Sequence, residues 1–466
     1  MNDTVDFLII GGGPAGLAAA VEADGLGLST LVLDEQPAPG GQIYRGIESV
    51  HPETRSVLGD DYGQGAALAG AFRASKADYR PGAAVWRVDE DGSVAYSQDG
   101  KGATATGTRI LVATGAMERP TPIPGWTLPG VMTAGGAQVL LKSSGMVPSG
   151  PVVVAGCGPL ALLITQQLIR AGADVVALLE TTKFGDYLSA APHLLTALRA
   201  RDYLRKGRQL RRDIRAAGVP IHSGVDALAA VGEDKVRAVS FKRNGARSEI
   251  AVDTLLLHFG VAPNTQITRQ VFCDHEWYEP QRYWRPVRDA WGATSQAAIA
   301  VAGDGGGIDG AVAAALTGRL AALDAAHRQG KIDQAERDRR AAPLRDEFAT
   351  HQAIRPLLDA LFPPPPQICA PPDDTTIVCR CEEISAGDIK EAVALGAMGP
   401  NQLKAFTRCG MGPCQGRMCG LTVSELIAKA RGETVEETGY YRIRPPIKPV
   451  TLGELAAMAA MAAMAD

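Results

Sequence analysis

The sequence predicts an α/β protein that contains two dinucleotide-binding units and a small helical domain near its C-terminal end. Two glycine-rich turns, at residues 11–16 and 156–161, each follow a run of apolar, largely β-branched residues and precede a helical pattern. Five of the eight cysteines fall within residues 378–420, which marks a separate domain. The predicted boundaries are 1–142 and 261–330 for the first unit, 143–260 for a second unit inserted into it, 331–372 for a helical and proline-rich linker, 373–432 for the cysteine-rich domain and 433–466 for a C-terminal tail.

The composition indicates a soluble globular protein of a reducing compartment. Hydrophobic residues make up 46% of the chain and charged residues 21%, the balance expected for large apolar cores. The formal net charge of −4 gives no electrostatic reason to expect nucleic acid as a partner. The N-terminus lacks a basic secretory region, and no apolar run reaches the roughly 20 residues of a membrane-spanning helix. We therefore expect a cytoplasmic protein, in which clustered cysteines bind metal or act in redox chemistry.

The first glycine-rich turn has the surroundings of a nucleotide-binding site. The strand predicted at residues 5–10 leads directly into the turn, and a helix and a second strand follow before the acidic pair at 34–35. Glycines bring the backbone close to a pyrophosphate, the helix N-terminus supplies N–H donors, and the acid accepts hydrogen bonds from a ribose. The candidate cofactor-binding residues here are Gly11, Gly13, Pro14, Ala15, Gly16, Asp34 and Glu35.

Two later segments favour FAD over NAD in this first unit. Thr114-Gly115 follows one predicted strand, and Gly303-Asp304 lies between another strand and a helix. They resemble the second and third flavin motifs of the flavoproteins with two dinucleotide-binding domains, a group that includes glutathione reductase and thioredoxin reductase. The resemblance implies that Asp304 binds the ribityl chain of FAD. It also implies FAD-binding roles for Gly41 and Gln42, in PGGQIYR beside the flavin ring, and for Val85 at the adenine end. The alternative is a unit that keeps this fold and has lost its ligand.

The second glycine-rich turn repeats the nucleotide-binding pattern. Gly156, Gly158 and Ala161 occupy the turn, and Glu180 ends the next predicted strand, where an acid favours NAD over NADP. Either this unit binds a nicotinamide nucleotide or it is a vestigial unit kept for packing. No pair of cysteines with the spacing of a redox disulfide lies near either turn, and Cys157 is expected to be an ordinary buried thiol. Electrons on a flavin must therefore leave by another route.

The cysteine spacing predicts a metal site in the C-terminal domain. Cys379-x-Cys381 precedes a stretch of 32 residues, and Cys414 and Cys419 follow with four residues between them. Soft thiolates suit iron–sulfur clusters, whereas zinc pairs usually have at least two residues between their cysteines. The pattern resembles the bacterioferritin-associated-ferredoxin-like domain, which implies that these four cysteines bind a [2Fe–2S] cluster. Zinc, or no metal at all, is the alternative. We expect Cys409 to lie outside the ligand set.

Local patterns add two structural expectations. Ser385 and Asn401 are expected to be the N-caps of two short helices between the cysteine pairs. Residues 199–215 hold eight basic side chains, which predicts either a solvated helix face or a docking surface for an acidic partner.

The chain as a whole resembles one subunit of the multi-subunit FAD-dependent amine and amino-acid dehydrogenases. The resemblance rests on DEQPAPGGQIYR, IPGWTLPGV and TRCGMGPCQGRMC, and on the joining of a two-unit flavoprotein to a cysteine-rich domain. Members include opine oxidase, hydrogen cyanide synthase, dye-linked proline dehydrogenase and D-hydroxyproline dehydrogenase. The resemblance implies a catalytic partner similar to D-amino-acid and sarcosine oxidases, a small third ferredoxin-like subunit, and an electron acceptor at the inner membrane. Some relatives hold FMN between subunits, and at least one keeps ATP rather than FAD in the first nucleotide site.

These patterns lead to one function hypothesis and two alternatives. The first is an electron-transfer subunit of a dehydrogenase that oxidises the C–N bond of a secondary amine or amino acid of opine, proline or glycine type. It relays electrons from the partner's flavin through its own flavin and [2Fe–2S] cluster. The second is a stand-alone NAD(P)H-dependent flavin reductase that feeds its own cluster, and the third is a scaffold with structural nucleotides. No general base or nucleophile stands out, so no catalytic residue is assigned to this chain.

Overall fold

The first unit is a seven-stranded sheet covered by helices on one face. The computed structural model describes residues 3–463, with side chains over residues 4–458. The strand order is β3-β2-β1-β6-β5-β4, and β19 pairs with β6 beside this path. Pairing is parallel from β3 to β6 and at β19, and antiparallel from β6 to β4. The strands are β1 (Asp3–Ile10), β2 (Thr30–Asp34), β3 (Asp78–Pro81), β4 (Ala84–Val88), β5 (Ser93–Gln98), β6 (Lys101–Val112) and β19 (Ile299–Val301).

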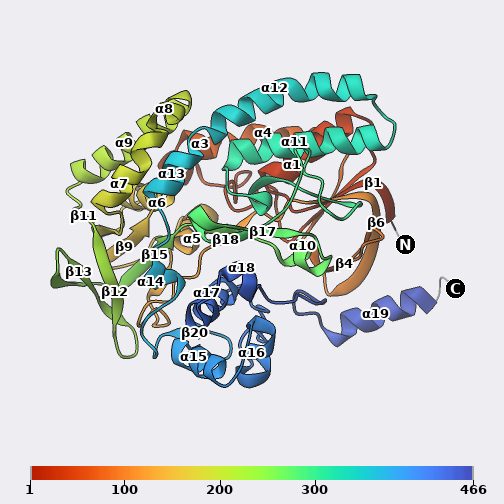
Figure 1. Cartoon of the computed structure of the whole chain (residues 1–466). Coiled ribbons are helices and arrows are strands. Elements are labelled where there is room, and N and C mark those ends of the chain that lie inside the picture. The colour runs from red at the N-terminus through yellow and green to blue at the C-terminus, as the bar shows by residue number, and fades with distance from the viewer. Residues whose placement is uncertain (1–2, 464–466) are drawn as a thin grey trace.

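Alternate residues of β1 enter two different cores. Phe7 and Ile9 pack with α1 (Pro14–Gly25) and α11 (Ala311–Arg328), whereas Leu8 and Ile10 face the opposite side of the sheet. Figure 1 shows α1 and α11 along one face, with α12 (Gln334–Gln352) outside them. Burial on both faces explains why this strand is continuously apolar. Three further helices, α2 (Pro52–Leu58), α3 (Asp60–Gly63) and α4 (Gly65–Ala74), lie in the connection from β2 to β3.

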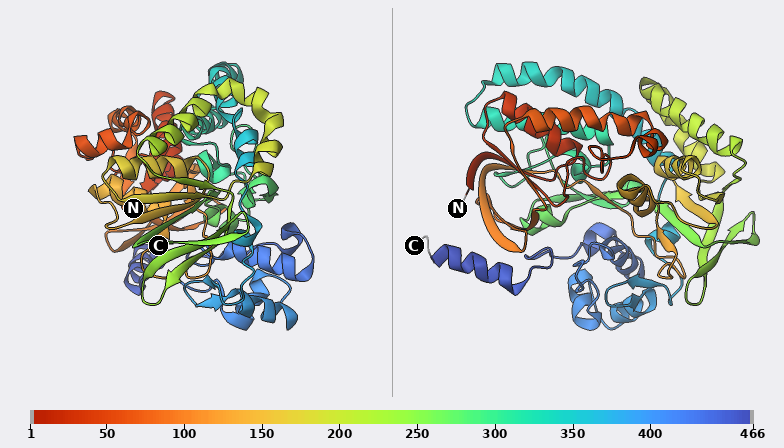
Figure 2. Two further views of the ribbon diagram at one scale, coloured as in Figure 1. Left: turned by 90° about the vertical axis from the view of Figure 1, so that its left-hand side faces the viewer. Right: turned by 180° about the vertical axis from the view of Figure 1, so that it is seen from behind.

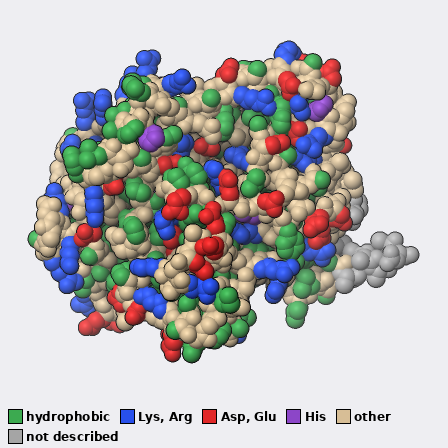
Figure 3. All heavy atoms as spheres, in the orientation of Figure 1, with side chains coloured by type: hydrophobic (Ala, Val, Ile, Leu, Met, Phe, Trp, Pro, Cys, Tyr) green, Lys and Arg blue, Asp and Glu red, His purple; other side chains and the backbone are tan. Residues whose placement is uncertain are grey.

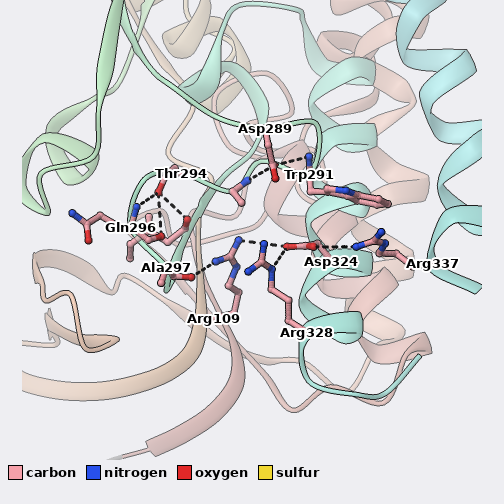
Figure 4. Close-up of polar contacts among 11 residues, drawn as sticks. Arg109, Asp289, Trp291, Thr294, Gln296, Ala297, Asp324, Arg328 and Arg337 are labelled. Atoms are coloured by element: carbon pink, nitrogen blue, oxygen red, sulfur yellow. Dashed lines mark hydrogen bonds and ion pairs between the residues drawn. The ribbon is translucent and has the colours of Figure 1, made fainter. Parts of the chain in front are cut away.

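A buried ion-pair network ties β6 to the helices. Arg109 of β6 lies 3.5 Å from the carboxylate of Asp324 in α11, and Arg328 and Arg337 approach the same carboxylate to 2.6 and 3.8 Å (Figure 4). Arg109 also donates to the carbonyl of Ala297. Both Arg109 and Asp324 are buried, so removing either one would leave an uncompensated charge. The network fixes the strand that leads to residues 113–115.

The second unit has its own five-stranded parallel sheet, in the order β11-β10-β9-β15-β8. Because β8 pairs with β15, this sheet takes in residues 131–133, ahead of the predicted start at 143. Antiparallel β7 and β16 are the two crossings between the units. The elements are β7 (Ala116–Glu118), β8 (Val131–Thr133), α5 (Ala134–Ser144), β9 (Val152–Cys157), α6 (Pro159–Arg170), β10 (Val175–Glu180), α7 (Phe184–Ala190), η1 (Ala191–His193), α8 (Leu194–Ala197), η2 (Leu198–Ala200), α9 (Arg201–Ala216), β11 (Ile221–Ser223), a separate sheet of β12 (Val225–Gly232), β13 (Val236–Arg243) and β14 (Ala246–Ala251), then β15 (Thr254–Phe259) and β16 (Val261–Pro263).

The chain then returns to the first unit and enters the C-terminal domain. Figures 1 and 2 place this domain beneath the first unit, on the side opposite to α11 and α12. The return consists of α10 (Gln266–Gln270), β17 (His275–Tyr278), η3 (Glu279–Gln281), β18 (Tyr283–Pro286), β19 and η4 (Gly303–Gly306). After α11 and α12 come α13 (Arg355–Leu361), α14 (Pro366–Cys369), β20 (Ile377–Cys379), β21 (Ile384–Ser385), α15 (Ala386–Ala394), α16 (Pro400–Thr407), α17 (Gly420–Arg431), α18 (Val435–Thr438) and α19 (Leu452–Ala463).

The two predicted helix caps have different outcomes. Ser385 is confirmed as the N-cap of α15, since its side chain accepts from the N–H of Asp388. The prediction for Asn401 is wrong, because α16 begins at Pro400 with Gly399 as its N-cap. Asn401 instead binds the later chain, accepting at 2.8 Å from the N–H of Arg442. Of the helices described, none combines the length and apolar character needed to cross a bilayer.

Candidate functional site

The first glycine-rich turn tolerates no side chain at two of its positions. A Cβ on Gly16 would lie 1.9 Å from the carbonyl oxygen of Gly11, and Gly11 itself has a φ of +112°. Pro14 begins α1, and Ala15 is buried behind the turn. The N–H groups at the start of this helix therefore face a space that only a close-fitting ligand group can share.

The acidic pair after β2 divides into one inward and one outward carboxylate. Asp34 is buried beside the turn, since a Cβ on Gly12 would lie 2.2 Å from its Oδ2. Tyr79 donates its hydroxyl to Asp34 at 3.2 Å, and burial raises the pKa of the Asp34 carboxyl. Glu35 is exposed and pairs with Lys448 of the C-terminal segment. Asp34 is therefore the acid placed to accept hydrogen bonds from a ribose at this turn.

The remaining flavin motifs gather around the same turn. A Cβ on Gly303 would lie 2.9 Å from the Ala15 side chain, and one on Gly305 would lie 3.5 Å from the carbonyl oxygen of Gly115. Asp304 accepts at 3.1 Å from two N–H groups at the start of α11, and burial raises the pKa of its carboxyl. Thr114 donates its hydroxyl to the carbonyl of Asn264 at 3.5 Å.

The segment PGGQIYR folds against this turn as well. A Cβ on Gly41 would lie 2.8 Å from the Cα of Gly13, so the two backbones are in direct contact. The side chain of Gln42 accepts from Arg45 at 3.0 Å, and its carbonyl accepts from the Lys142 ammonium at 3.0 Å. Sequence reasoning missed Lys142, which is buried on α5 of the second unit. Burial lowers its pKa to about 7.

Val85 is set apart from the other predicted cofactor residues. It lies in β4 opposite Tyr96, and both side chains belong to the apolar core beneath the sheet. Its strand does start beside the nucleotide turn, since the N–H of Ala83 donates to the carbonyl of Asp34 at 2.9 Å. The side chain of Val85 thus supports the core rather than lining the turn.

The second turn has the nucleotide-binding shape, but its acid is already engaged. A Cβ on Gly156 would lie 1.7 Å from the carbonyl oxygen of His258, and Gly158 has a φ of +96°. Ala161 is buried in α6. Glu180 is also buried, and Arg211 donates to its two carboxylate oxygens at 3.0 and 2.7 Å. The hydroxyl of Ser223 donates a third hydrogen bond at 3.0 Å. Three donors therefore occupy the carboxylate that a ribose would need.

Five cysteine sulfurs gather in the C-terminal domain in two groups. The sulfurs of Cys379, Cys409 and Cys419 all lie within 4.8 Å of one another, and the three residues are buried. Cys381 and Cys414 form a second pair, with 3.7 Å between their sulfurs. All eight cysteines of the chain are free thiols. The sequence prediction left Cys409 out of the ligand set, yet its sulfur lies inside the buried group. Its four-residue spacing before Cys414 was the available signal.

The local electrostatics of the buried thiols favour one thiolate. Hydrogen bonds from Cys409 and Cys419 lower the pKa of the Cys379 thiol to about 2, and the same contact raises that of Cys409 to about 12. The hydroxyl of Tyr441 donates to the carbonyl of Cys409 at 3.1 Å and to its sulfur at 3.5 Å. A soft, buried set of sulfurs of this kind suits a thiophilic metal.

The C-terminal domain is anchored to both units of the flavoprotein fold. The indole N–H of Trp126 donates to the carbonyl of Ile377 at 2.7 Å, next to Cys379. Arg269 lies between two rings, 5.0 Å from that of Trp284 and 4.2 Å from that of Tyr440. The buried carboxylate of Glu425 also pairs with a guanidinium across this junction. These contacts hold the cysteine domain in a fixed position against the flavin-type unit.

Comparison with known proteins agrees with this architecture. The family described as pyridine nucleotide-disulphide oxidoreductase matches residues 5–330, and the sarcosine oxidase A3 domain matches residues 374–459. The chain belongs to the pyridine nucleotide-disulphide oxidoreductase family. The predicted fold class, an α/β flavoprotein with two dinucleotide-binding domains and a helical C-terminal region, is confirmed. The chain is accordingly an oxidoreductase.

Individual relatives extend over nearly the whole chain. One of the subunits of opine oxidase from Rhizobium meliloti is 43% identical over 466 residues, which is 98% of this chain and 88% of the relative. Hydrogen cyanide synthase subunit HcnB of Pseudomonas aeruginosa is 32% identical and covers 95% of this chain and 96% of its own. Among solved structures, L-proline dehydrogenase from P. horikoshii has a TM-score of 0.71 at 20% identity, over 97% of this chain and 80% of that one. The predicted resemblance to opine oxidase and hydrogen cyanide synthase subunits is confirmed.

Proposed function

We propose that this chain is the electron-transfer subunit of a multi-subunit dehydrogenase that oxidises the C–N bond of a secondary amine or amino acid. Its substrate is oxidised in a partner subunit similar to D-amino-acid and sarcosine oxidases, and a small ferredoxin-like subunit is a further partner. This chain passes the electrons through FAD and a [2Fe–2S] cluster to an acceptor. The similarity to opine oxidase and sarcosine oxidase subunits supports an amine or amino acid as the reductant.

The observation that carries the proposal is the gathering of five cysteine sulfurs in a domain packed on a flavin-type unit. Within the described part of the chain no disulfide is present, so a bound flavin has no disulfide beside it to reduce. The cysteine domain instead supplies the exit for electrons. When bound, FAD would supply the conversion between two-electron and one-electron transfer, and a [2Fe–2S] cluster would carry single electrons onward.

The residues present fit both groups. The turn at Gly11 and Gly16 is a cradle that any Cβ would fill, and Asp34 and Asp304 place carboxylates at its two ends. Cys379 and Cys419, with Cys381 and Cys414, are the proposed cluster ligands. Burial of the triad excludes water, and the anchoring of Trp126 next to Cys379 keeps the domain close to the flavin-type unit. An FMN at the subunit interface, or ATP instead of FAD at the first turn, rests on the family resemblance alone.

A stand-alone NAD(P)H-dependent reductase is the alternative, and one contact counts against it. The carboxylate of Glu180 is bound by Arg211 and Ser223, so it has no free side for the ribose of NAD. The Gly156 turn keeps its shape, as the packing of the second sheet requires. We therefore propose that the second unit is structural.

The proposal is tested by the reductant that bleaches the flavin. The chain is purified without oxygen, alone and with the partner that co-purifies with it. NADH is added to each preparation, and separately a panel of opines, proline, hydroxyprolines and sarcosine, while the flavin absorbance is followed. Bleaching by one of these amines only when the partner is present supports the proposal. Rapid bleaching of the isolated chain by NADH would contradict it and make the chain a pyridine-nucleotide reductase.

A further inference from the structure

The crossover from β10 to β11 presents an unusual surface, formed by residues 183–215 and called here the α7–α9 surface. Phe184 is 77% exposed and Leu195 is 81% exposed, although both are large apolar residues. The exposed large apolar side chains of this surface are Phe184, Tyr187, Leu188, Leu194, Leu195, Leu198 and Tyr203. Contiguous exposed apolar patches on soluble proteins mark sites of interaction.

The segment is amphipathic in the reverse of the usual sense. Its buried positions are the small residues Ala190, Ala197 and Ala200, which pack against Ile354 and Leu357. A helix that only covered the protein would turn leucine and phenylalanine inward and leave alanine or polar residues outside. Here the largest apolar side chains point away from the protein, so their burial must occur against something outside the chain.

A ring of unpaired positive charge borders this apolar tip. Among the described residues, no ion pair or side-chain hydrogen bond is made by Arg199, Arg201, Arg208, Arg212 or Arg215. The nearby acids are already engaged, since Asp202 pairs with Arg205 and Asp213 with Arg170. Figure 3 shows hydrophobic and Lys or Arg side chains side by side at the upper left, over these helices. This concentration of cations stands out in a chain of net charge −4.

We propose that the α7–α9 surface docks the protein on an anionic lipid bilayer. The phenylalanine and leucine side chains enter the boundary of the acyl region, and the arginines bind the phosphodiester head groups. A bilayer matches both halves of the surface at once, because it is a polyanion over an apolar interior and needs no complementary pockets for protruding side chains. Figures 1 and 2 place this surface on the side away from the C-terminal domain, so docking leaves the cysteine domain accessible to a partner subunit.

The proposal is tested by co-sedimentation of the full chain with vesicles. One set contains phosphatidylcholine alone, and the other contains equal parts of phosphatidylcholine and phosphatidylglycerol. We expect binding to the anionic vesicles only, and weaker binding as salt is added. Phe184→Ser with Leu195→Ser, and separately Arg208→Glu with Arg212→Glu, should each lower the bound fraction about tenfold. The matched controls are Leu395→Ser and Arg247→Glu, exposed residues of other elements, which should bind as the unchanged chain does.

Three results would overturn the proposal. The first is that the chain ignores both kinds of vesicle, including the case in which the same variants abolish self-association and so assign the surface to a second copy. The second is binding by the isolated chain that disappears in the complex with its co-purified partner, which assigns the surface to the interface between the two proteins. The third is equal loss of binding in the control variants. Because these measurements follow lipid binding and not electron transfer, they stand or fall separately from the proposed function.

Discussion

The guanidinium of Arg211 donates to both carboxylate oxygens of Glu180, at 3.0 and 2.7 Å. Glu180 ends β10 of the second unit, where a nucleotide-binding domain keeps an acid for the ribose hydroxyls. The same residue type at the same position thus serves an internal ion pair in this chain. The contact joins β10 to α9 and accounts for a unit that keeps the nucleotide-binding fold without offering the nucleotide its acid.

Breaking this pair from one side should destabilise the protein. In Arg211→Met the buried carboxylate of Glu180 loses its counter-charge, and we expect the free energy of unfolding to fall by about 3 kcal/mol. Adding Glu180→Gln to that variant should restore much of the loss, because no buried charge remains. Urea denaturation measures both values. Arg212→Met, the exposed neighbour without a described ion pair, is the control and should be nearly neutral. A single Arg211 variant as stable as the unchanged protein would show that the pair is not formed.

Nucleotide binding should depend on one glycine of α1 and not on another. In Gly16→Ala the new Cβ meets the carbonyl oxygen of Gly11 at 1.9 Å, so the turn must open and flavin should be lost. Gly25→Ala, at the other end of the same helix, meets no atom within 4 Å and should keep its flavin. Flavin released from the purified, denatured proteins is measured by fluorescence. Full flavin content in the Gly16 variant would remove the first turn from the cofactor site.

Cys409 should matter to metal binding although the sequence pattern leaves it out. Its sulfur lies within 4.8 Å of those of Cys379 and Cys419, so Cys409→Ser should weaken metal retention about 10- to 100-fold, as loss of a contact to a ligand does. Cys379→Ser should abolish retention. Cys369→Ser, a buried thiol of α14 outside the group, is the control. Iron and zinc per chain are measured by elemental analysis against a chelator series. Unchanged retention in the Cys409 variant would restrict the site to the four predicted cysteines.

Lys142 should give the protein a distinctive pH dependence. Burial lowers its pKa from 10.5 to about 7. Between these values the unfolded chain holds a proton that the folded chain has released, so the free energy of unfolding contributed by this residue rises with pH, by up to about 1.4 kcal/mol per pH unit. Lys142→Met should remove that rise and be relatively most stabilised at pH 7 and below. Denaturation is measured from pH 6 to pH 10, with the exposed Lys429→Met as control. A pH dependence that survives in Lys142→Met assigns it to other groups.

Much of the fold follows from local sequence, and the site follows in part. The strand, glycine turn and helix at residues 5–25 are signalled by adjacent residues, and the structure has β1 and α1 there. Distinguishing Asp34 from Glu35 required the fold, because only the end of β2 decides which carboxylate turns inward. Asn401 has the side chain of an N-cap, but Pro400 already occupies the first turn of α16, which moves the cap to Gly399.

Long-range contacts set the remaining differences. The pairing of Glu180 with Arg211 joins residues that sequence spacing does not relate, so the acid looked available for a ribose. Lys142 lies on a helix of the second unit and reaches Gln42 of the first, a contact that depends on how the units pack. Cys409 enters the buried sulfur group through the path of the chain around Tyr441, which hydrogen-bonds to it. Each of these features is a property of the packed chain and has no local signature.

The most direct test of the central claim is an EPR measurement on the complex with its co-purified partner. The active amine is added without oxygen, and the spectrum is taken before and after. We predict that a reduced [2Fe–2S] signal appears with the amine. We also predict that Cys414→Ser removes the signal while the partner's flavin still bleaches. Cys157→Ser, a buried thiol of the second unit, should leave both responses intact. A complex whose flavins bleach fully with the amine while no iron–sulfur signal develops would contradict the role of this chain as the electron relay.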